Sequence, residues 1–413
     1  MRHGLGLLGV MALILATAPS SAQDQAKQWE LCVNKGGDLA PDLQIGGCTA
    51  IIQAGTETAE NMAIAFFNRG IAYGRMGELD REIEDYGHAI RLNPNDAAAF
   101  FNRGAAYGRK GDHDREILDY DQAIRLDPDD AAAFFNRAFA HGRKGDYERE
   151  VQDYGHVIRL APDNAGAFYN RGLAHVRNGQ HERGIADFDQ AIRLDPNDVD
   201  AFIARGNAYG DKGQHDRAIQ DYDDAIRLNP NNAVAFSNRG SAYHDKGQHE
   251  RAIRDYSEAI RLDPSNADTF ISRGEVYEEK GEYDRAIQDF DQAIRLNPGD
   301  AEALNIRCYA KASAGHLAGA LTDCNEALRL KPDAAHVLDS RGFTYLKMGR
   351  FKEAIADYDA ALAIDPKHAE ALFGRGVAQR RMGNASAGDA DITAANAIDS
   401  GIAAKLARRG LVP

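Results

Sequence analysis

The chain has 413 residues and a formal net charge of −14, from 63 acidic and 49 basic side chains. This excess of acid disfavours attraction to nucleic-acid phosphates or to anionic lipid, so neither is an expected partner. Hydrophobic residues make up 44% of the chain and only 12 residues are proline, which excludes a disordered or collagen-like chain.

Residues 1–22 have the pattern of an export signal. A basic start precedes an apolar run from Leu5 to Ala18, and small residues stand before Gln23, as signal peptidase requires. An uncleaved anchor helix is the alternative, but the run is shorter than the roughly 20 apolar residues that span a bilayer. We therefore expect cleavage near Ala22, a periplasmic or secreted protein, and no membrane span.

Residues 23–62 are expected to form a degenerate pair of helices that caps a helical array. Cys32 and Cys48 stand 16 residues apart in this segment, and Cys308 and Cys324 repeat the spacing. Residues equidistant from the turn of a helix hairpin face each other, so we expect both pairs to form disulfides in an exported chain. The alternative is that Cys308 is merely a small residue and Cys324 a core residue.

A period of 34 residues extends from residue 63 to residue 402. Nine prolines from Pro94 to Pro366 keep this spacing without an insertion, and so do ten glycines from Gly77 to Gly383. Internal repetition of this length is typical of helical solenoids. The ten repeats are expected at 63–96, 97–130, 131–164, 165–198, 199–232, 233–266, 267–300, 301–334, 335–368 and 369–402.

Each repeat is expected to form a helix, a turn, a second helix and another turn. In the first repeat Gly77 separates two amphipathic segments, and Pro94 ends the second because proline lacks the amide proton. With places numbered 1–34 in each repeat, an aromatic at place 4, Gly at 8, Tyr at 11, an aromatic at 24, Ala at 27 and Pro at 32 recur. Arginines at place 7 and aspartates at place 23, beginning with Arg69 and Asp85, are expected to pair.

This pattern resembles the tetratricopeptide repeat family over all ten repeats. The resemblance implies an all-α fold, a right-handed α-solenoid superhelix of 34-residue helix-turn-helix repeats with terminal capping helices. Residues 403–413 are expected to form the C-terminal capping helix and tail. Glu82, Glu116 and Glu150 depart from the pattern, because the family prefers a small residue at place 20.

In this family one side of the first helix lines a concave groove. Places 2, 5, 6, 9, 12 and 13 share that side, here called the groove face. An aromatic at place 5, an asparagine at 6 and an arginine at 13 recur in the first four repeats, and we expect the aromatics to point away from the core. The candidate groove residues are Phe67, Asn68, Arg75, Phe101, Asn102, Arg109, Phe135, Asn136, Arg143, Tyr169, Asn170, Arg177 and, in the sixth repeat, Asn238.

The row of asparagines predicts recognition of a peptide backbone. An amide both donates and accepts hydrogen bonds, so regularly spaced amides can hold an extended chain, while the arginines favour carboxylates. The row resembles the asparagine ladder of O-GlcNAc transferase, from which Ala204, Ser272, Ile306, Ser340 and Gly374 depart. The alternative is that asparagine merely suits an exposed helical position. Place 13 turns acidic at Asp211, Asp245 and Glu279, which suggests a second binding region of opposite charge.

No catalytic pairing, phosphate-binding loop or metal-ligand spacing stands out, so we expect no enzyme, no cofactor and no metal. His113, His181, His215 and His249 follow the turn glycines and are expected to be packing groups. We expect an exported bacterial scaffold that binds proteins or peptides with an extended, acidic segment in the periplasm. The alternative is a structural subunit or assembly factor packed permanently in a cell-envelope complex. The sequence does not indicate an oligomeric state.

Overall fold

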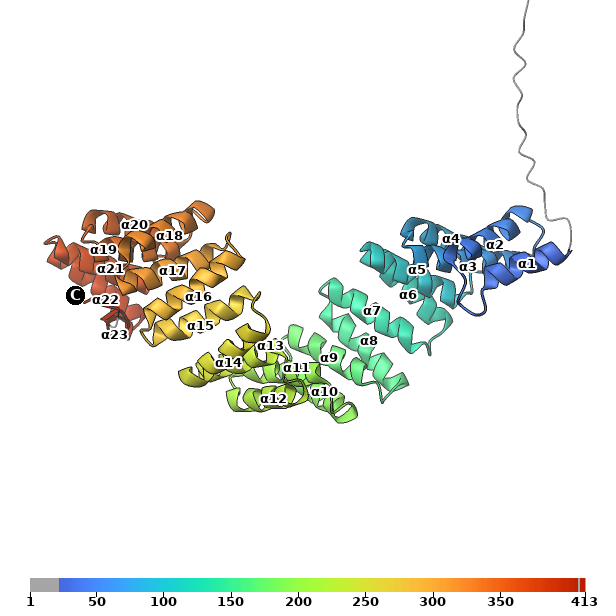
Figure 1. Ribbon diagram of the computed structural model, residues 1–413, viewed down its shortest axis with the longest axis horizontal. Helices are drawn as coiled ribbons and strands as arrows, with labels where there is room; N and C mark the ends of the chain where they lie inside the picture. The colour runs from blue at the N-terminus through green and yellow to red at the C-terminus, as the bar shows by residue number, and fades with distance from the viewer. Residues whose placement is uncertain (1–21, 408, 413) are drawn as a thin grey trace, which may run out of the picture. The chain divides into compact units, whose positions relative to one another are not determined.

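The computed structural model describes residues 22–407 and 409–412, and this part of the chain folds into helices without a strand (Figure 1). The predicted export signal lies, except for Ala22, outside the described residues. Within them, no helix is both long enough and apolar enough to cross a bilayer. The described residues divide into two compact units, one that ends at Pro196 and one that begins at Asn197.

Two helices precede the first repeat, α1 (Ala22–Val33) and α2 (Pro41–Ala54). A disulfide between Cys32 and Cys48 joins them, with the two Cα atoms 4.6 Å apart. Both cysteines are buried in a small core with Ile51. The helix pair covers the start of the array, as a terminal cap does.

The ten repeats follow as alternating first and second helices. The first helices are α3 (Ala59–Met76), α5 (Ala97–Lys110), α7 (Ala131–Arg143), α9 (Ala165–Arg177), α11 (Val199–Asp211), α13 (Ala233–Asp245), α15 (Ala267–Glu279), α17 (Ala301–Ala314), α19 (Ala335–Lys347) and α21 (Ala369–Arg381). The second helices are α4 (Leu79–Leu92), α6 (His113–Leu126), α8 (Tyr147–Leu160), α10 (His181–Leu194), α12 (His215–Leu228), α14 (His249–Leu262), α16 (Tyr283–Leu296), α18 (Leu317–Leu330), α20 (Phe351–Ile364) and α22 (Ala385–Ile398). The short helix α23 (Ile402–Ala407) comes last.

Within each compact unit the helix pairs stack in chain order, as an α-solenoid requires. Turn chemistry sets the helix ends: Gly77 ends α3 in the left-handed region at φ 76°, where a side chain would be strained. At the start of α5, Asp96 accepts a hydrogen bond from the amide of Ala99. The helix α3 begins at Ala59, four residues before the predicted start of the first repeat at residue 63.

A buried aromatic ring stands at place 24 in eight of the ten repeats, whereas the eighth repeat has Cys324 and the tenth has Ile392 at this place. Tyr86 is 1% exposed, and its ring lies where a Cβ on Gly70 would approach to 2.9 Å. The absence of a side chain on the glycine at place 8 thus leaves space for the ring. Close contact of this kind fixes how the two helices of one repeat pack.

Each arginine at place 7 pairs with the aspartate at place 23 of its own repeat, which confirms the predicted pairing. The closest N···O distances are 2.6–2.7 Å in Arg69–Asp85, Arg103–Asp119, Arg137–Asp153, Arg171–Asp187, Arg205–Asp221, Arg239–Asp255, Arg273–Asp289, Arg307–Asp323, Arg341–Asp357 and Arg375–Asp391. Arg137 also reaches Asp121 of the preceding repeat at 2.6 Å. The ladder therefore links the helices of a repeat and, at such positions, neighbouring repeats.

The second disulfide lies inside the eighth repeat. Cys308 of α17 and Cys324 of α18 are bonded, with Cα atoms 5.5 Å apart, and both are buried. In the same repeat Lys311 joins Arg307 on the carboxylate of Asp323. This repeat is thus cross-linked covalently where the other nine rely on packing and ion pairs.

Candidate functional site

The four aromatic residues at place 5 do not point away from the core. Each ring packs on the buried ring at place 24 of its own repeat: the centroids of Phe67 and Tyr86 are 5.5 Å apart, and those of Phe135 and Tyr154 are 5.2 Å apart. Phe101 and Tyr169 make the same contact. The expectation that these aromatics point away from the core was wrong, because each half-buried ring covers a core ring.

The asparagines of the first four repeats lie half-buried on the groove face. Asn102 donates a 2.8 Å hydrogen bond to the carbonyl of Ala98, and Asn170 does the same to Gly166. Asn136 instead lies near the hydroxyl of Tyr120; burial raises the pKa of this hydroxyl, and Asn136 opposes the rise. A side-chain amide has two N–H groups and an acceptor oxygen, so the amides of Asn102 and Asn170 each keep an N–H and the oxygen for a further partner.

Asn238 lies apart from this row, in the second compact unit. Its amide donates to Oδ1 of Asn207 at 2.9 Å, and the hydroxyl of Tyr222 donates to the same oxygen at 2.7 Å. These residues line a pocket of ≈250 Å³ together with His215 and Asp245. The site of Asn238 is therefore a local polar pocket with acid nearby, unlike the arginine-rich face of the first four repeats.

The arginines at place 13 differ in what they contact. Arg109 lies 2.5 Å from Glu82, and Arg177 lies 3.7 Å from Glu150. Arg75 donates to the carbonyl of Leu39 at 3.1 Å, and Arg143 lies over the ring of Phe139 at 4.7 Å. Two of the four arginines thus pair with a buried glutamate of the preceding repeat.

Three buried glutamates lie beneath the groove face of the first repeats. Glycine at place 12 leaves space for these side chains, since a Cβ on Gly142 would lie 2.6 Å from the carboxylate of Glu150. The carboxylates of Glu82 and Glu116 lie in the same way against Gly74 and Gly108. Every one of these three carboxyl side chains is at most 7% exposed.

Burial changes the acidity of two of these glutamates. It raises the pKa of Glu150 to about 7, and the attraction of Arg177 opposes the rise only in part. It also raises the pKa of Glu82, against the hydrogen bond from Arg109. One oxygen of Glu82 and one of Glu150 are buried without a hydrogen-bond partner. The floor of the groove face therefore carries carboxyl groups that are only partly neutralised.

In the second compact unit, the chain's own C-terminal residues lie on the groove face. The helix α23 packs beside α21 and α22 (Figure 1), and Lys405 lies 2.6 Å from Glu370 at place 2. Arg409 donates to the hydroxyl of Tyr309 at place 9 over 2.6 Å and lies 3.4 Å from Glu278 at place 12. Lys347, at place 13, donates to the carbonyl of Arg409.

Apolar contacts hold the same segment. Ile402, Leu406 and Leu411 are each at most 3% exposed and join the core of the last repeats. The segment predicted as the C-terminal capping helix and tail thus forms the short helix α23, followed by a tail. This tail contacts the first helices of repeats seven, eight and nine. Glu278, next in sequence to Glu279 of the predicted acidic region, faces this tail. Burial raises the pKa of Glu278 to about 7.

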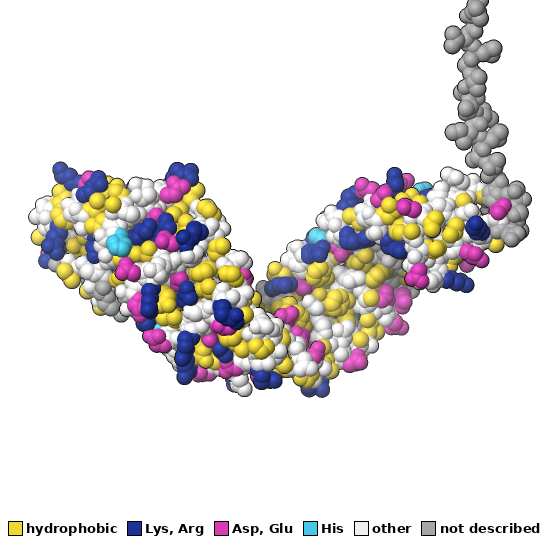
Figure 2. Space-filling model, viewed as in Figure 1, with side chains coloured by type: hydrophobic (Ala, Val, Ile, Leu, Met, Phe, Trp, Pro, Cys, Tyr) yellow, Lys and Arg dark blue, Asp and Glu magenta, His cyan; other side chains and the backbone are white. Residues whose placement is uncertain are grey.

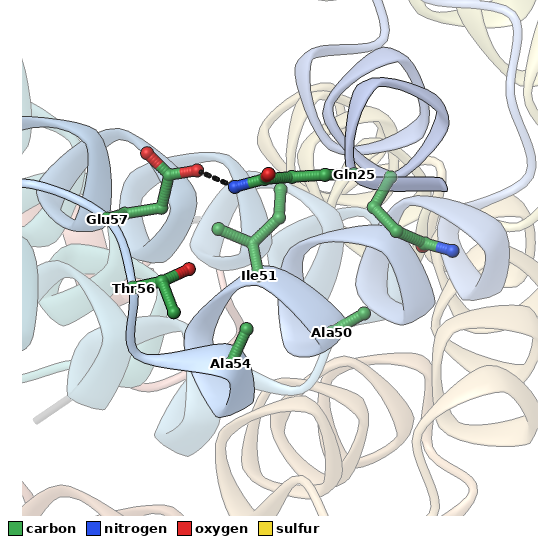
Figure 3. Close-up of a pocket in the computed structure, with 7 residues that line it drawn as sticks. Gln25, Ala50, Ile51, Ala54, Thr56 and Glu57 are labelled. Atoms are coloured by element: carbon green, nitrogen blue, oxygen red, sulfur yellow. Dashed lines mark hydrogen bonds between the residues drawn. The ribbon is translucent and has the colours of Figure 1, made fainter. Parts of the chain in front are cut away.

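A separate pocket of ≈400 Å³ lies between α1, α2 and the segment that follows α2 (Figure 3). Glu57 at its edge accepts hydrogen bonds from Trp29 at 2.9 Å, from Gln25 at 2.8 Å and from Asn61 at 2.7 Å. The bond from Trp29, before the others, lowers the pKa of Glu57. This carboxylate is satisfied by its own neighbours, so it fastens the N-terminal cap to the first repeat.

Charges of both signs are interspersed over the visible face of the chain (Figure 2). A phosphate backbone binds to a continuous row of cations. The visible face offers no such row among the described residues, in keeping with the net charge of −14.

Profiles described as TPR repeat match residues 76–111, 117–145, 206–247, 240–281 and 342–383. Profiles described as tetratricopeptide repeat match residues 97–130, 165–198, 188–220 and 267–300. The chain belongs to the tetratricopeptide repeat (TPR) family. This family is generally a non-enzymatic repeat scaffold, so membership supports a role in protein interaction.

Three solved structures illustrate the similarity to other TPR proteins. YrrB, described as a TPR protein with an unusual peptide-binding site, is 25% identical, with a TM-score of 0.39 over 44% of this chain and 94% of that chain. MamA is 24% identical, with a TM-score of 0.39 over 42% and 94%. A tetratricopeptide repeat protein from Parabacteroides merdae is 21% identical, with a TM-score of 0.48 over 57% and 93%. No match was found among curated proteins.

Sequence reasoning overlooked two parts of this TPR groove face. Glu82, Glu116 and Glu150 were recognised only as departures at place 20, although glycine at place 12 of the same repeats indicates the room they occupy. The return of the C-terminal tail to Tyr309 and Glu278 left no signal in the repeat pattern, because it joins residues 100 and 131 positions apart.

Proposed function

We propose that this TPR protein is a non-enzymatic scaffold that binds extended peptide segments in its concave groove, along the groove face of the first four repeats. The observation that carries the proposal is the position of the chain's own tail. Residues 402–411 contact places 2, 9, 12 and 13 of the last four repeats through ion pairs, hydrogen bonds and apolar burial. The same places in the first four repeats are therefore suited to a segment from another protein.

The chemistry of the first four repeats supports backbone recognition. Asn102 and Asn170 are spaced by a whole number of repeats and keep amide groups for a partner, while half-buried rings at place 5 offer apolar contact between them. Each backbone hydrogen bond of this kind contributes about 0.5–1.5 kcal/mol to binding. The partner is then held without strong dependence on its side chains.

A preference for acidic segments would rest on two of the four arginines. Within the described residues, neither Arg75 nor Arg143 has a carboxylate within 4.0 Å, whereas Arg109 and Arg177 face Glu82 and Glu150. Unpaired guanidinium groups attract carboxylates more strongly than paired ones do. We therefore assign the preference to Arg75 and Arg143.

The place of action in the proposal is the periplasm, after cleavage near Ala22. The leader pattern of residues 1–22 supports export. Two buried disulfides also support an oxidising compartment, where such bonds form and persist.

The test begins with an array of random peptides probed with the chain from Gln23 onward, followed by fluorescence anisotropy on the best binder. Asn102→Ala combined with Asn170→Ala should weaken binding roughly tenfold, because backbone hydrogen bonds are lost. Gln152→Ala, an exposed amide on α8, is the matched control and should bind like the parent. Equal affinity of all three proteins would contradict the proposal and favour a structural subunit or assembly factor that packs through other faces.

A further inference from the structure

Two histidines and a glutamate from three consecutive helices meet at the edge of the groove face. His244 stands near the end of α13, His249 is the first residue of α14, and Glu279 is the last residue of α15. One ligand atom from each lies within 4.8 Å of the other two. Nε2 of His244 is 3.1 Å and Nδ1 of His249 is 3.9 Å from the same oxygen of Glu279. Repeats six and seven therefore share this cluster.

One of the three ligand atoms is left unsatisfied. Nδ1 of His249 is buried and has no hydrogen-bond partner. A buried polar atom without a partner is costly, and a metal ion would supply the missing partner. A neutral imidazole coordinates a metal through either Nδ1 or Nε2, so Nδ1 of His249 can serve as a ligand.

The surrounding charges favour a cation. Glu275, which is also on α15, lies close enough to His244 and Glu279 to interact with both electrostatically. Lys280, next in sequence to Glu279, is engaged by Glu250 and Glu282 at 2.6 Å each, so its charge is balanced. A cation at the cluster thus meets net negative charge.

The preceding repeat contains the same arrangement with one ligand missing. His215 and Asp245 occupy the places of His249 and Glu279, with Nδ1 and Oδ2 3.6 Å apart. Gly210 stands where His244 does, and a Cβ built on it meets no atom within 4 Å. Place 12 therefore distinguishes a three-ligand cluster from a two-ligand pair.

We propose that His244, His249 and Glu279 bind one divalent transition-metal ion of the class that includes Zn²⁺, Ni²⁺ and Cu²⁺. Two imidazoles and a carboxylate suit these ions, whereas Mg²⁺ and Ca²⁺ prefer oxygen ligands alone. Bonds of about 2.0–2.2 Å in tetrahedral geometry place ligand atoms about 3.4 Å apart. Ligand atoms that lie within 4.8 Å of one another must therefore approach by at most about 1.4 Å to close the site.

The ion would fasten α13, α14 and α15 to one another and so join repeat six to repeat seven. Three protein ligands leave at least one coordination position, for water or for a side chain of a bound segment. Sequence spacing did not predict this site, because its ligands lie 5 and 30 residues apart along the chain and meet only when two repeats stack.

The test uses the full chain, expressed without a histidine tag and stripped with a chelator. Zn²⁺ affinity and stoichiometry are measured by competition with a chromophoric chelator, and the visible absorption of Co²⁺ reports the ligand set. We expect one equivalent bound in the micromolar range or tighter. His249→Ala and Glu279→Gln should each weaken binding at least tenfold, with circular dichroism checking that each variant folds.

Two variants in repeat five complete the design. His215→Ala is the matched control and should leave the Zn²⁺ affinity unchanged. Gly210→His should add a second equivalent by completing the pair of His215 and Asp245. Absence of a micromolar equivalent in the parent would overturn the proposal, and so would unchanged affinity in both His249→Ala and Glu279→Gln. Failure of Gly210→His to gain a second equivalent would overturn the role of place 12.

Discussion

Nη2 of Arg109 in α5 lies 2.5 Å from Oε1 of Glu82, which is buried in α4 of the preceding repeat. An arginine placed by its repeat position on the groove face thus serves first as the partner of an internal carboxylate. Arg177 stands in the same relation to Glu150, at 3.7 Å. The four arginines of the first repeats are alike in sequence and fall into two kinds in the structure.

The two kinds of arginine predict different effects of substitution to alanine. Arg109→Ala leaves the buried carboxylate of Glu82 without its partner and should destabilise the protein by roughly 1–3 kcal/mol. Arg143→Ala breaks no ion pair among the described residues and should change stability little, while weakening the binding of acidic peptides. Urea unfolding midpoints and anisotropy titrations of both variants check this pair of effects. The prediction fails if Arg143→Ala is the more destabilising change.

Glu150 should make the protein less stable as pH rises. Burial raises its pKa from 4.5 to about 7 in the folded chain. Below the unfolded pKa both states hold the proton, and between the two values only the unfolded state ionises, so stability falls as pH rises through this window. Glu150→Gln should therefore stabilise the chain by roughly 1–3 kcal/mol at about pH 8 and have little effect at about pH 4.5. Glu148→Gln, on the exposed side of the same helix, should show no such pH dependence in thermal unfolding.

Gly142 and Glu150 should be energetically coupled. A Cβ on Gly142 would lie 2.6 Å from the Glu150 carboxylate, so Gly142→Ala should cost about 1–3 kcal/mol in the parent. In a Glu150→Ala background the clash is gone, and alanine should stabilise α7 by up to about 1 kcal/mol because it is the better helix former. A double-mutant cycle measured by urea unfolding gives the coupling. Additive effects of the two changes would show that the carboxylate does not occupy this space.

The C-terminal tail should compete with peptides in the last repeats. A chain that ends at residue 401 loses the contacts of Lys405 and Arg409 with Glu370, Tyr309 and Glu278. A peptide of residues 402–413 should bind to this shortened chain and show little binding to the full chain, whose own tail covers the site. Arg409→Ala in the peptide should reduce its binding. Calorimetry that finds equal binding to both chains would contradict the assigned position of the tail.

The repeats were predictable because glycine and proline set the turns at a fixed period, and because the ladder of Arg69 and Asp85 lies within one repeat. Contacts between repeats were not predictable in the same way. Whether Arg109 faces a peptide or Glu82 depends on how two repeats stack, and sequence spacing does not give that geometry. The half-buried position of Phe101 was missed for a related reason. Helical periodicity predicts the direction in which a side chain points, but not whether a neighbouring side chain such as Tyr120 packs against it.

Site-specific photo-crosslinking tests the central claim most directly, because it asks where a bound peptide lies. A photoreactive residue is placed at Asn102 on the groove face, or at Leu118, which is 61% exposed on α6. The chain is then irradiated with the peptide selected for binding, and the adducts are analysed by mass spectrometry. We predict an adduct from position 102 and none from position 118. Adducts from position 118 alone would contradict binding along the groove face.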